Sequence, residues 1–159
     1  MRVIQTVLMF LRAYLPALLT TYLIASILHT QSVLLNLVQL NIDISLRQWL
    51  FTTLEDIQGL LVLYGSAIAF TVLIAIIVAM WIATRRDYNP TVRALIYALA
   101  GATGMWVMLA AMQPILNVTL IAGARSTLGV TMQCMAGLIG GLVFFTCHKT
   151  RDRNKPSSR

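Results

Sequence analysis

Uncharged apolar stretches alternate with short charged segments along the whole chain. No Asp, Glu, Lys or Arg occurs in residues 13–42, 57–84, 94–124 and 126–148. A helix rises about 1.5 Å per residue, so roughly 20 apolar residues cross the hydrocarbon core of a bilayer, and each stretch can hold one such helix. We therefore expect an all-α membrane protein with four transmembrane helices. The expected helices cover about residues 13–30, 60–83, 91–113 and 126–146.

The basic residues are distributed unevenly around these segments. Leu60–Ala83 is uncharged and is followed at once by Arg85 and Arg86. Short cytoplasmic loops are enriched in Lys and Arg, so this pair indicates the cytoplasmic side. With four spans, only Arg47 and Arg125 fall on the other side. The remaining ten of the 12 basic residues share the cytoplasmic side, which predicts that both termini are cytoplasmic.

The segment between the first two spans alternates apolar and polar positions with a helical period. Ser45 and Gln48 fit a capping box, and Leu46, Trp49, Leu50, Leu54 and Ile57 then form an apolar stripe. We expect an amphipathic helix over about residues 45–58. Two arrangements remain open: the helix lies in the outer interface with Trp49 as its anchor, or it pairs outside the membrane with an extension of the first helix to about residue 39.

Composition supports the same class. Of 159 residues, 58% are hydrophobic and 11% are charged, whereas soluble domains are about a quarter charged. The net charge is +7, but the basic residues flank apolar segments, so we expect contact with the lipid bilayer and not with nucleic acid. The connections are short, which predicts one transmembrane domain over residues 1–148 and a basic, disordered cytoplasmic tail over 149–159.

The N-terminal segment allows a second interpretation, a cleaved signal peptide. The apolar part continues well beyond a usual signal core, and no clean small-residue cleavage motif follows it. We therefore expect an uncleaved first helix, with Pro16 near its start, where a missing N–H costs least. The bacterial cytoplasmic membrane is the location we expect.

A cation stands at the expected start of the fourth span. Arg125 is followed by Ser126 and Thr127. A helix N-terminus already carries partial positive charge, so a cation there favours a bound anion such as a phosphate or carboxylate headgroup. The alternative is that Arg125 extends to ordinary lipid phosphates or pairs with an outer acidic residue.

Three amide side chains lie at or near membrane depth in the last two spans: Gln113, Asn117 and Gln133. They could line a polar path, but such amides more often form hydrogen bonds between helices. In the same spans, Gly137 and Gly141 form a GxxxG motif, and Ala100 and Gly104 have the matching spacing. We expect these small residues to pack the last two spans closely together.

Metal, redox and catalytic signatures are missing from the sequence. His29 and His148 lie near opposite membrane faces in this topology, which makes a bis-histidine haem within one chain impossible, and we expect both to be interfacial. Cys134 and Cys147 are 13 residues apart, roughly 20 Å along a helix and beyond disulfide reach. We expect no cofactor and no metal, and an integral membrane enzyme is the least favoured class, because the sequence shows no identifiable acid–base or nucleophile pair.

Two hypotheses of function follow. The first is a non-catalytic subunit or accessory component of a membrane assembly, with a membrane-protein partner or a second copy of this chain. It rests on the small-residue packing motifs, the absence of acidic residues from the expected helix cores and the basic tail. The alternative is a transporter, flippase or pore for an amphipathic anion or lipid headgroup, with Arg125 as the recognition group.

Overall fold

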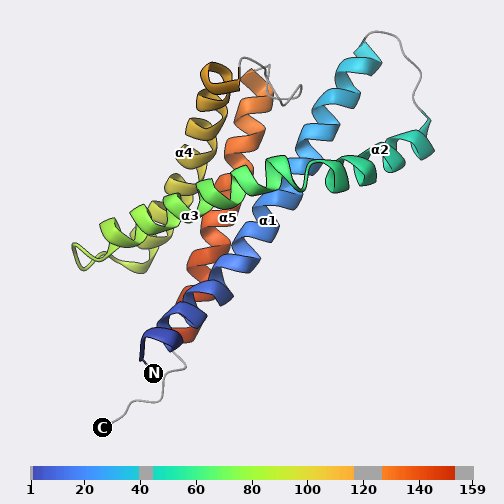
Figure 1. The fold of residues 1–159 in the computed structure, drawn as a ribbon. Helices are drawn as coiled ribbons and strands as arrows, with labels where there is room; N and C mark the ends of the chain where they lie inside the picture. Colours follow the sequence, from blue (N-terminus) through green and yellow to red (C-terminus); the bar gives the residue numbers. More distant parts are fainter. Residues whose placement is uncertain (1, 40–44, 117–126, 153–159) are drawn as a thin grey trace.

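The computed structural model describes residues 2–39, 45–116 and 127–152, and these residues form five helices (Figure 1). The helices are α1 (Arg2–Gln39), α2 (Leu46–Gly59), α3 (Leu63–Ala83), α4 (Pro90–Leu116) and α5 (Thr127–Asp152). All except α2 are long and apolar enough to cross a membrane. The chain is therefore an all-α, multi-pass membrane protein, as its hydrophobic pattern predicts.

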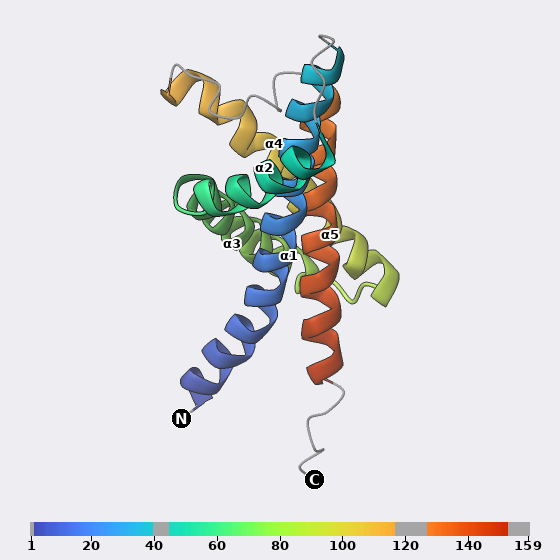
Figure 2. The ribbon, with the colours of Figure 1, turned by 90° about the vertical axis from the view of Figure 1, so that its right-hand side faces the viewer.

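The helix α5 lies at the centre of the arrangement. It packs against α1 and against α4, while α3 packs mainly on α4 (Figures 1 and 2). The N-terminal end of α1 and the C-terminal end of α5 lie at the same end of the molecule (Figure 2). We use the term basic end for this end, which carries Arg12 and Lys149. Helix α2 folds back along the other half of α1 and leads into α3.

Helix α1 is much longer than the expected span of residues 13–30. Its outer face carries large exposed apolar side chains at almost every turn, and residues four apart are buried on its inner face. The exposed residues include Ile4, Leu8, Leu11, Leu15, Leu19, Leu23, Ile27, Leu35 and Val38, and the buried ones include Ala13, Ala17, Thr21 and Ala25. Both faces continue the helical period past residue 30, and the helix extends to residue 39, as the sequence allowed.

The polar residues after Leu28 do not mark the end of the first helix. Thr30 and Ser32 are buried and donate hydrogen bonds to carbonyls of their own helix, those of Ser26 and Leu28, at 3.0 Å and 2.8 Å. Such bonds satisfy a hydroxyl inside a helix. Because α1 begins at Arg2, Pro16 lies in its interior and not near its start, which corrects the expected position. Membrane helices tolerate an interior proline when neighbouring groups compensate for the lost backbone bond.

Helix α2 forms where the amphipathic pattern predicts it. The Ser45 side chain accepts from the backbone N–H of Gln48, and the Gln48 side chain accepts from the backbone N–H of Ser45, so the predicted capping box is present. Leu60 follows the last helical residue, Gly59, and its carbonyl accepts from the backbone N–H of Tyr64 at 2.9 Å. The chain thus turns from α2 into α3 within three residues.

The other boundaries differ from the expected ones by a few residues. Helix α4 continues through Pro114 to Leu116, three residues past the expected end, although the proline removes one backbone hydrogen bond to the preceding turn. Membrane helices tolerate such a loss where neighbouring groups compensate for it. Helix α5 continues to Asp152, so residues 149–152 are helical and not part of a disordered tail. The remainder of the expected tail lies outside the described residues.

Glycines set the contact between α4 and α5. A Cβ added at Gly101 would overlap the carbonyl oxygen of Gly137, and one added at Gly141 would overlap that of Tyr97. The two backbones therefore touch without an intervening side chain, as small residues permit in membrane helices. Gly137 and Gly141 face α4, but they contact Gly101 and Tyr97 and not the expected Ala100 and Gly104.

Gly104 belongs to a different contact. A Cβ at Gly104 would lie 3.2 Å from the Ala75 Cβ and 3.2 Å from the Thr71 Cγ2, both on α3. The expected pairing of Gly104 with α5 is therefore wrong. Gly101 and Gly104 are three positions apart on α4, so they point in different directions around the helix axis. Gly101 contacts α5, and Gly104 contacts α3.

Candidate functional site

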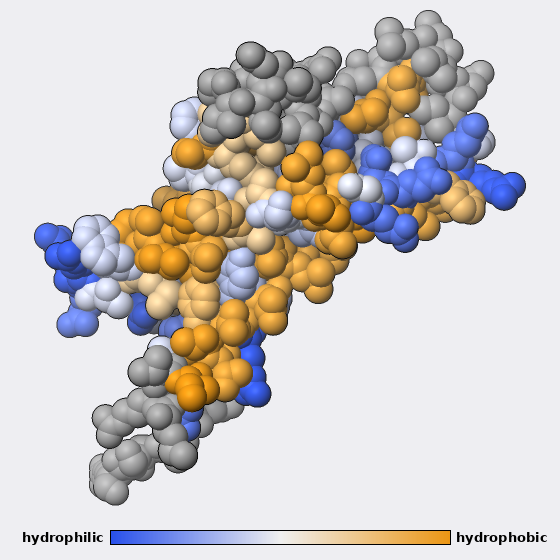
Figure 3. Space-filling view, in the orientation of Figure 1, coloured by the Kyte–Doolittle hydropathy of each residue, from blue (hydrophilic) through white to orange (hydrophobic). Residues whose placement is uncertain are grey.

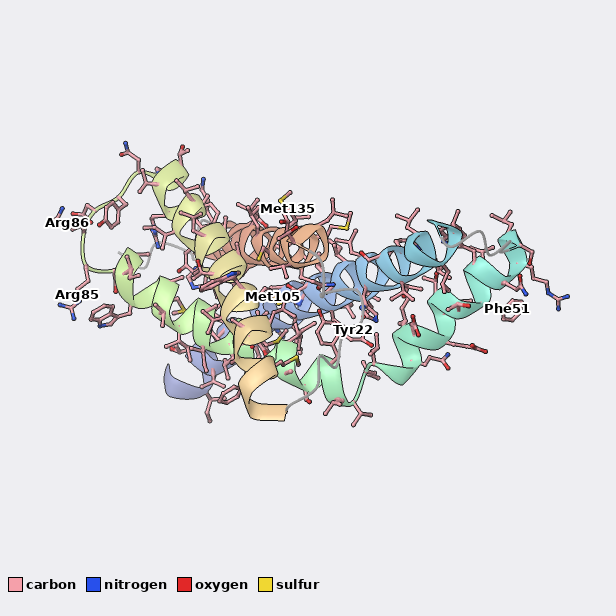
Figure 4. All side chains as sticks on the ribbon, turned by 90° about the horizontal axis from the view of Figure 1, so that it is seen from above. Tyr22, Phe51, Arg85, Arg86, Met105 and Met135 are labelled. Carbon is pink, nitrogen blue, oxygen red and sulfur yellow. The ribbon has the colours of Figure 1, made fainter. Side chains whose placement is uncertain are left out.

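Hydrogen-bonding side chains from four helices meet where α1, α2, α3 and α5 come together. We call this group the polar seam and define it by the side chains that carry its bonds between helices. They are Tyr22 and Thr30 of α1, Asp56 of α2, Tyr64 of α3 and Gln133 of α5, with Ser26 and His29 of α1 beside them. Figure 4 shows Tyr22 in the middle of the molecule, between Arg85 and Arg86 at one end and Phe51 at the other.

Gln133 links three helices from a buried position on α5, with 2% of its surface exposed. Its Oε1 accepts a hydrogen bond of 2.6 Å from the Tyr64 hydroxyl, and its Nε2 donates one of 3.0 Å to the backbone carbonyl of Ala25. Both ends of the amide are thus engaged by protein. Of the two interpretations that the sequence left open, the contacts of Gln133 match a hydrogen bond between helices.

Two further bonds attach α2 to α1. The Thr30 hydroxyl lies 2.9 Å from Asp56 Oδ2, and the Tyr22 hydroxyl donates to the backbone carbonyl of Ile57. Thr30 is fully buried, and it can donate its single proton either to Asp56 or to the carbonyl of Ser26 within its own helix.

Two buried polar atoms of the seam have no hydrogen-bond partner within the described ranges, Ser26 Oγ and His29 Nδ1. Ser26 is fully buried and His29 is 8% exposed, and the Asp56 carboxylate interacts electrostatically with His29. An unsatisfied buried polar group costs about 1–3 kcal/mol.

His29 is thus buried against other parts of the protein, which the sequence did not predict. It is three residues from Ser26, so the two side chains share a helix face, and α2 folds over that part of α1. Trp49 extends the same contact, because its Nε1 donates to Gln31 Oε1 at 2.7 Å. Trp49 is thus held by α1 and is not simply a lipid anchor.

The other residues singled out from the sequence are not brought to the seam by the described part of the chain. Thr127 is the first residue of α5 and is exposed, and its backbone carbonyl accepts from the Thr131 hydroxyl at 2.8 Å. Arg125, Ser126 and Asn117 lie outside the described residues, and so does the side chain of Gln113. The expected anion site at Arg125 stays a prediction.

No metal-binding group of three or more His, Cys, Asp or Glu residues occurs among the residues that the structure describes. Cys134 and Cys147 are free thiols, both partly buried on α5. The interactions that the structure shows at the seam are hydrogen bonds between helices and the electrostatic interaction of Asp56 with His29.

The sequence did not identify Thr30, Asp56 or Tyr64 as members of a site. The sequence signal was the possible hairpin of α2 with the extension of α1, because antiparallel pairing brings the end of α2 back to the middle of α1. Asp56 lies outside every apolar span, so a search for acidic residues inside the spans passes over it. Comparison of the chain with protein-family models, curated proteins and solved structures finds no match.

Proposed function

We propose that this protein is a non-catalytic subunit or accessory component of a membrane assembly, whose polar seam fixes the arrangement of its own helices. The observation that carries the proposal is the environment of Gln133. This buried amide side chain of α5 forms hydrogen bonds with Tyr64 and with the Ala25 carbonyl, which supports a role in holding helices together. An amide that recognised a transported solute would need to be exposed to a path, whereas only 2% of the surface of Gln133 is exposed.

The surface of the described helices supports the same role. Apolar side chains cover most of the face seen in Figure 3, with hydrophilic ones gathered at the α3–α4 turn and along α2. Large exposed residues on α3 and α4 include two tryptophans, Trp81 and Trp106, at 59% and 55% exposure. Aromatic residues are frequent anchors of interfaces between proteins. In a bilayer, an exposed tryptophan contacts either such a partner or lipid.

The proposed orientation places the basic end in the cytoplasm of a bacterial cell. Two cations near helix ends lie over aromatic rings: the Arg85 Cζ is 4.2 Å from the Trp81 ring centre, and the Lys149 Nζ is 5.7 Å from that of Phe145. Both pairs come from the C-terminal ends of spans, α3 and α5. Aromatic and basic residues at one membrane face are typical of a cytoplasmic interface, which supports the N-in, C-in topology.

The test is purification in a mild detergent, with mass spectrometry of the proteins and lipids that remain bound. Wild type is compared with Arg125→Ala and with Arg47→Ala, the other arginine on the proposed outer side. We expect a stoichiometric protein partner, or a defined homo-oligomer, that both variants retain. Loss of a specific anionic lipid from Arg125→Ala alone, with no protein partner in any sample, would contradict the proposal and favour a headgroup transporter or flippase.

A further inference from the structure

Helix α2 has three distinct faces, and only one of them is covered by the rest of the chain. The covered face carries Trp49, Asp56 and Ile57, which are partly buried and contact α1 through Gln31, Thr30 and Tyr22. No residue of α2 is fully buried. The other two faces of the helix are therefore in contact with the surroundings of the protein, which are lipid, water or another protein.

The second face is a row of exposed leucines, which we call the leucine stripe. It consists of Leu46, Leu50 and Leu54, each four residues from the next, at 78%, 60% and 59% exposure. Residues four apart lie on the same side of a helix, so the three side chains form one continuous apolar surface. Beyond the helix the row continues into Leu61 and Val62, at 56% and 81% exposure, and then into α3.

The third face is polar. Gln48 and Glu55 are exposed on it. Between this face and the leucine stripe lie Arg47 and Phe51, with the Arg47 Cζ 5.5 Å from the Phe51 ring centre. An aromatic ring with a cation beside it is common at headgroup level, where one side of the residue is apolar and the other is hydrated.

The pairing of α2 with α1 has the polarity expected in lipid and not the one expected in water. The contact between the two helices contains Thr30, Asp56 and the Trp49–Gln31 bond, whereas leucines point outward. A helical hairpin standing in water buries its leucines and exposes its polar groups. Exposed contiguous apolar patches of this kind mark membrane or protein contacts.

The surroundings of α2 are continuous with the lipid-facing surface of the spans. The exposed apolar face of α1 continues alongside α2 through Leu35 and Val38, and the leucine stripe joins the exposed start of α3 at Leu63. At about 1.5 Å per residue, α1 is about 57 Å long, which exceeds the roughly 30 Å hydrocarbon core, so its outer half must reach the interface. The lipid that surrounds the exposed faces of α1 and α3 therefore also reaches α2.

We propose that α2 lies in the membrane interface opposite the basic end, with its leucine stripe among the acyl chains and its polar face toward water. Phospholipid therefore covers the leucine stripe, with its headgroups near Arg47 and Phe51. In this position α2 and the surrounding lipid separate the Thr30–Asp56 contact from water. The proposal adds a lipid-contacting element to the proposed function and does not depend on it.

The test is site-directed spin labelling of the full-length protein in vesicles of phosphatidylethanolamine and phosphatidylglycerol. Both native cysteines are first changed, Cys134→Ala and Cys147→Ala. Single cysteines are then introduced by Leu50→Cys and Leu54→Cys on the leucine stripe, with Glu55→Cys as the matched control on the polar face. All three positions are exposed, so the label should not disturb the fold. Collision with apolar oxygen and with a water-soluble nickel chelate is measured at each position.

We expect oxygen to collide more often than the nickel chelate at positions 50 and 54, and the reverse at position 55. Nickel access at 50 and 54 equal to that at 55 would overturn the proposal, because the hairpin would then stand in water. Protection of 50 and 54 from both reagents would overturn it as well, since protein would cover the stripe; coupling between labels of two chains would identify that protein as a second copy. The second result would leave the proposed function intact.

Discussion

The contact between α4 and α5 and the polar seam join helices in opposite ways. At Gly101 and Gly137 the two backbones touch, and neither residue contributes a side chain. In the seam, side chains bridge the helices, as in the chain of bonds from Tyr64 to Gln133 to the Ala25 carbonyl. The first contact relies on the close fit of two surfaces, and the second on directed hydrogen bonds between buried groups.

The difference follows from the solvent. Lipid is as apolar as leucine, so burying leucine between helices gains little, and association depends on close packing and on hydrogen bonds. Close packing depends on the fit of the whole contact surface, so one added side-chain atom forces the two helices apart. A hydrogen bond between helices contributes about 1 kcal/mol and can be lost alone. We therefore expect the glycine contact to be intolerant of substitution and the seam to be moderately tolerant.

The largest effect is expected for Gly101→Val. Its side chain would overlap the Gly137 backbone, so α4 and α5 must separate, at a cost of about 3 kcal/mol in the free energy of unfolding. Thermal unfolding in detergent, followed by circular dichroism, measures it. Gly59→Ala is the control, since a Cβ there meets no atom within 4 Å. If Gly101→Val were as stable as Gly59→Ala, the direct backbone contact would be refuted.

A smaller loss is expected for Gln133→Leu, which removes the acceptor of the Tyr64 hydroxyl and the donor to the Ala25 carbonyl. Leaving these groups unsatisfied should cost about 1–2 kcal/mol in the same unfolding experiment. Thr103→Val is the control, because the exposed Thr103 hydroxyl bonds only to Leu99 of its own helix.

A double-mutant cycle with Tyr64→Phe isolates the bond between the two side chains. We expect the double variant to be less destabilised than the sum of the single variants, by about 0.6 kcal/mol, as is usual for bonds between membrane helices. Strict additivity would mean that the loss in Gln133→Leu comes from packing and not from this hydrogen bond.

Asp56→Ala should loosen α2 from α1 and leave the glycine contact unchanged. Thr30 loses its acceptor on α2 but keeps the Ser26 carbonyl as an alternative, so we expect about 1 kcal/mol. The readout is a broader distance distribution between spin labels on α1 and α2. Glu55→Ala, an exposed acid one residue away, is the control and should leave the distribution as in wild type. Equal broadening in both variants would show that general charge, and not the contact with Thr30, determines the position of α2.

The smallest effect is expected for Ser45→Ala at the start of α2. Loss of the capping box should cost about 0.5–1 kcal/mol, confined to the first turn of this helix. Hydrogen–deuterium exchange should then accelerate near residue 48 and stay unchanged in α4 and α5. Ser45→Thr, which keeps a hydroxyl, should restore most of the protection.

Much of the fold was predictable, because length, charge and apolar content decide where a chain can cross a bilayer. The four spans and the capped helix α2 occur where the pattern predicts them, within a few residues at most ends. The largest error concerned α1, where buried polar residues such as Thr30 resembled an exit from the membrane. A polar side chain looks the same in the sequence whether water or a neighbouring helix satisfies it.

The sequence by itself thus determined the class of the protein, its spans and the cap of α2, since these depend on local composition and on hydrogen bonds within one segment. Only the tertiary structure decided which helix each face meets: that Gly104 faces α3, that Tyr64 reaches Gln133 and that Asp56 meets Thr30. The physical reason is that in a membrane both faces of a span are apolar. Hydropathy therefore cannot separate a face that packs against protein from a face that meets lipid.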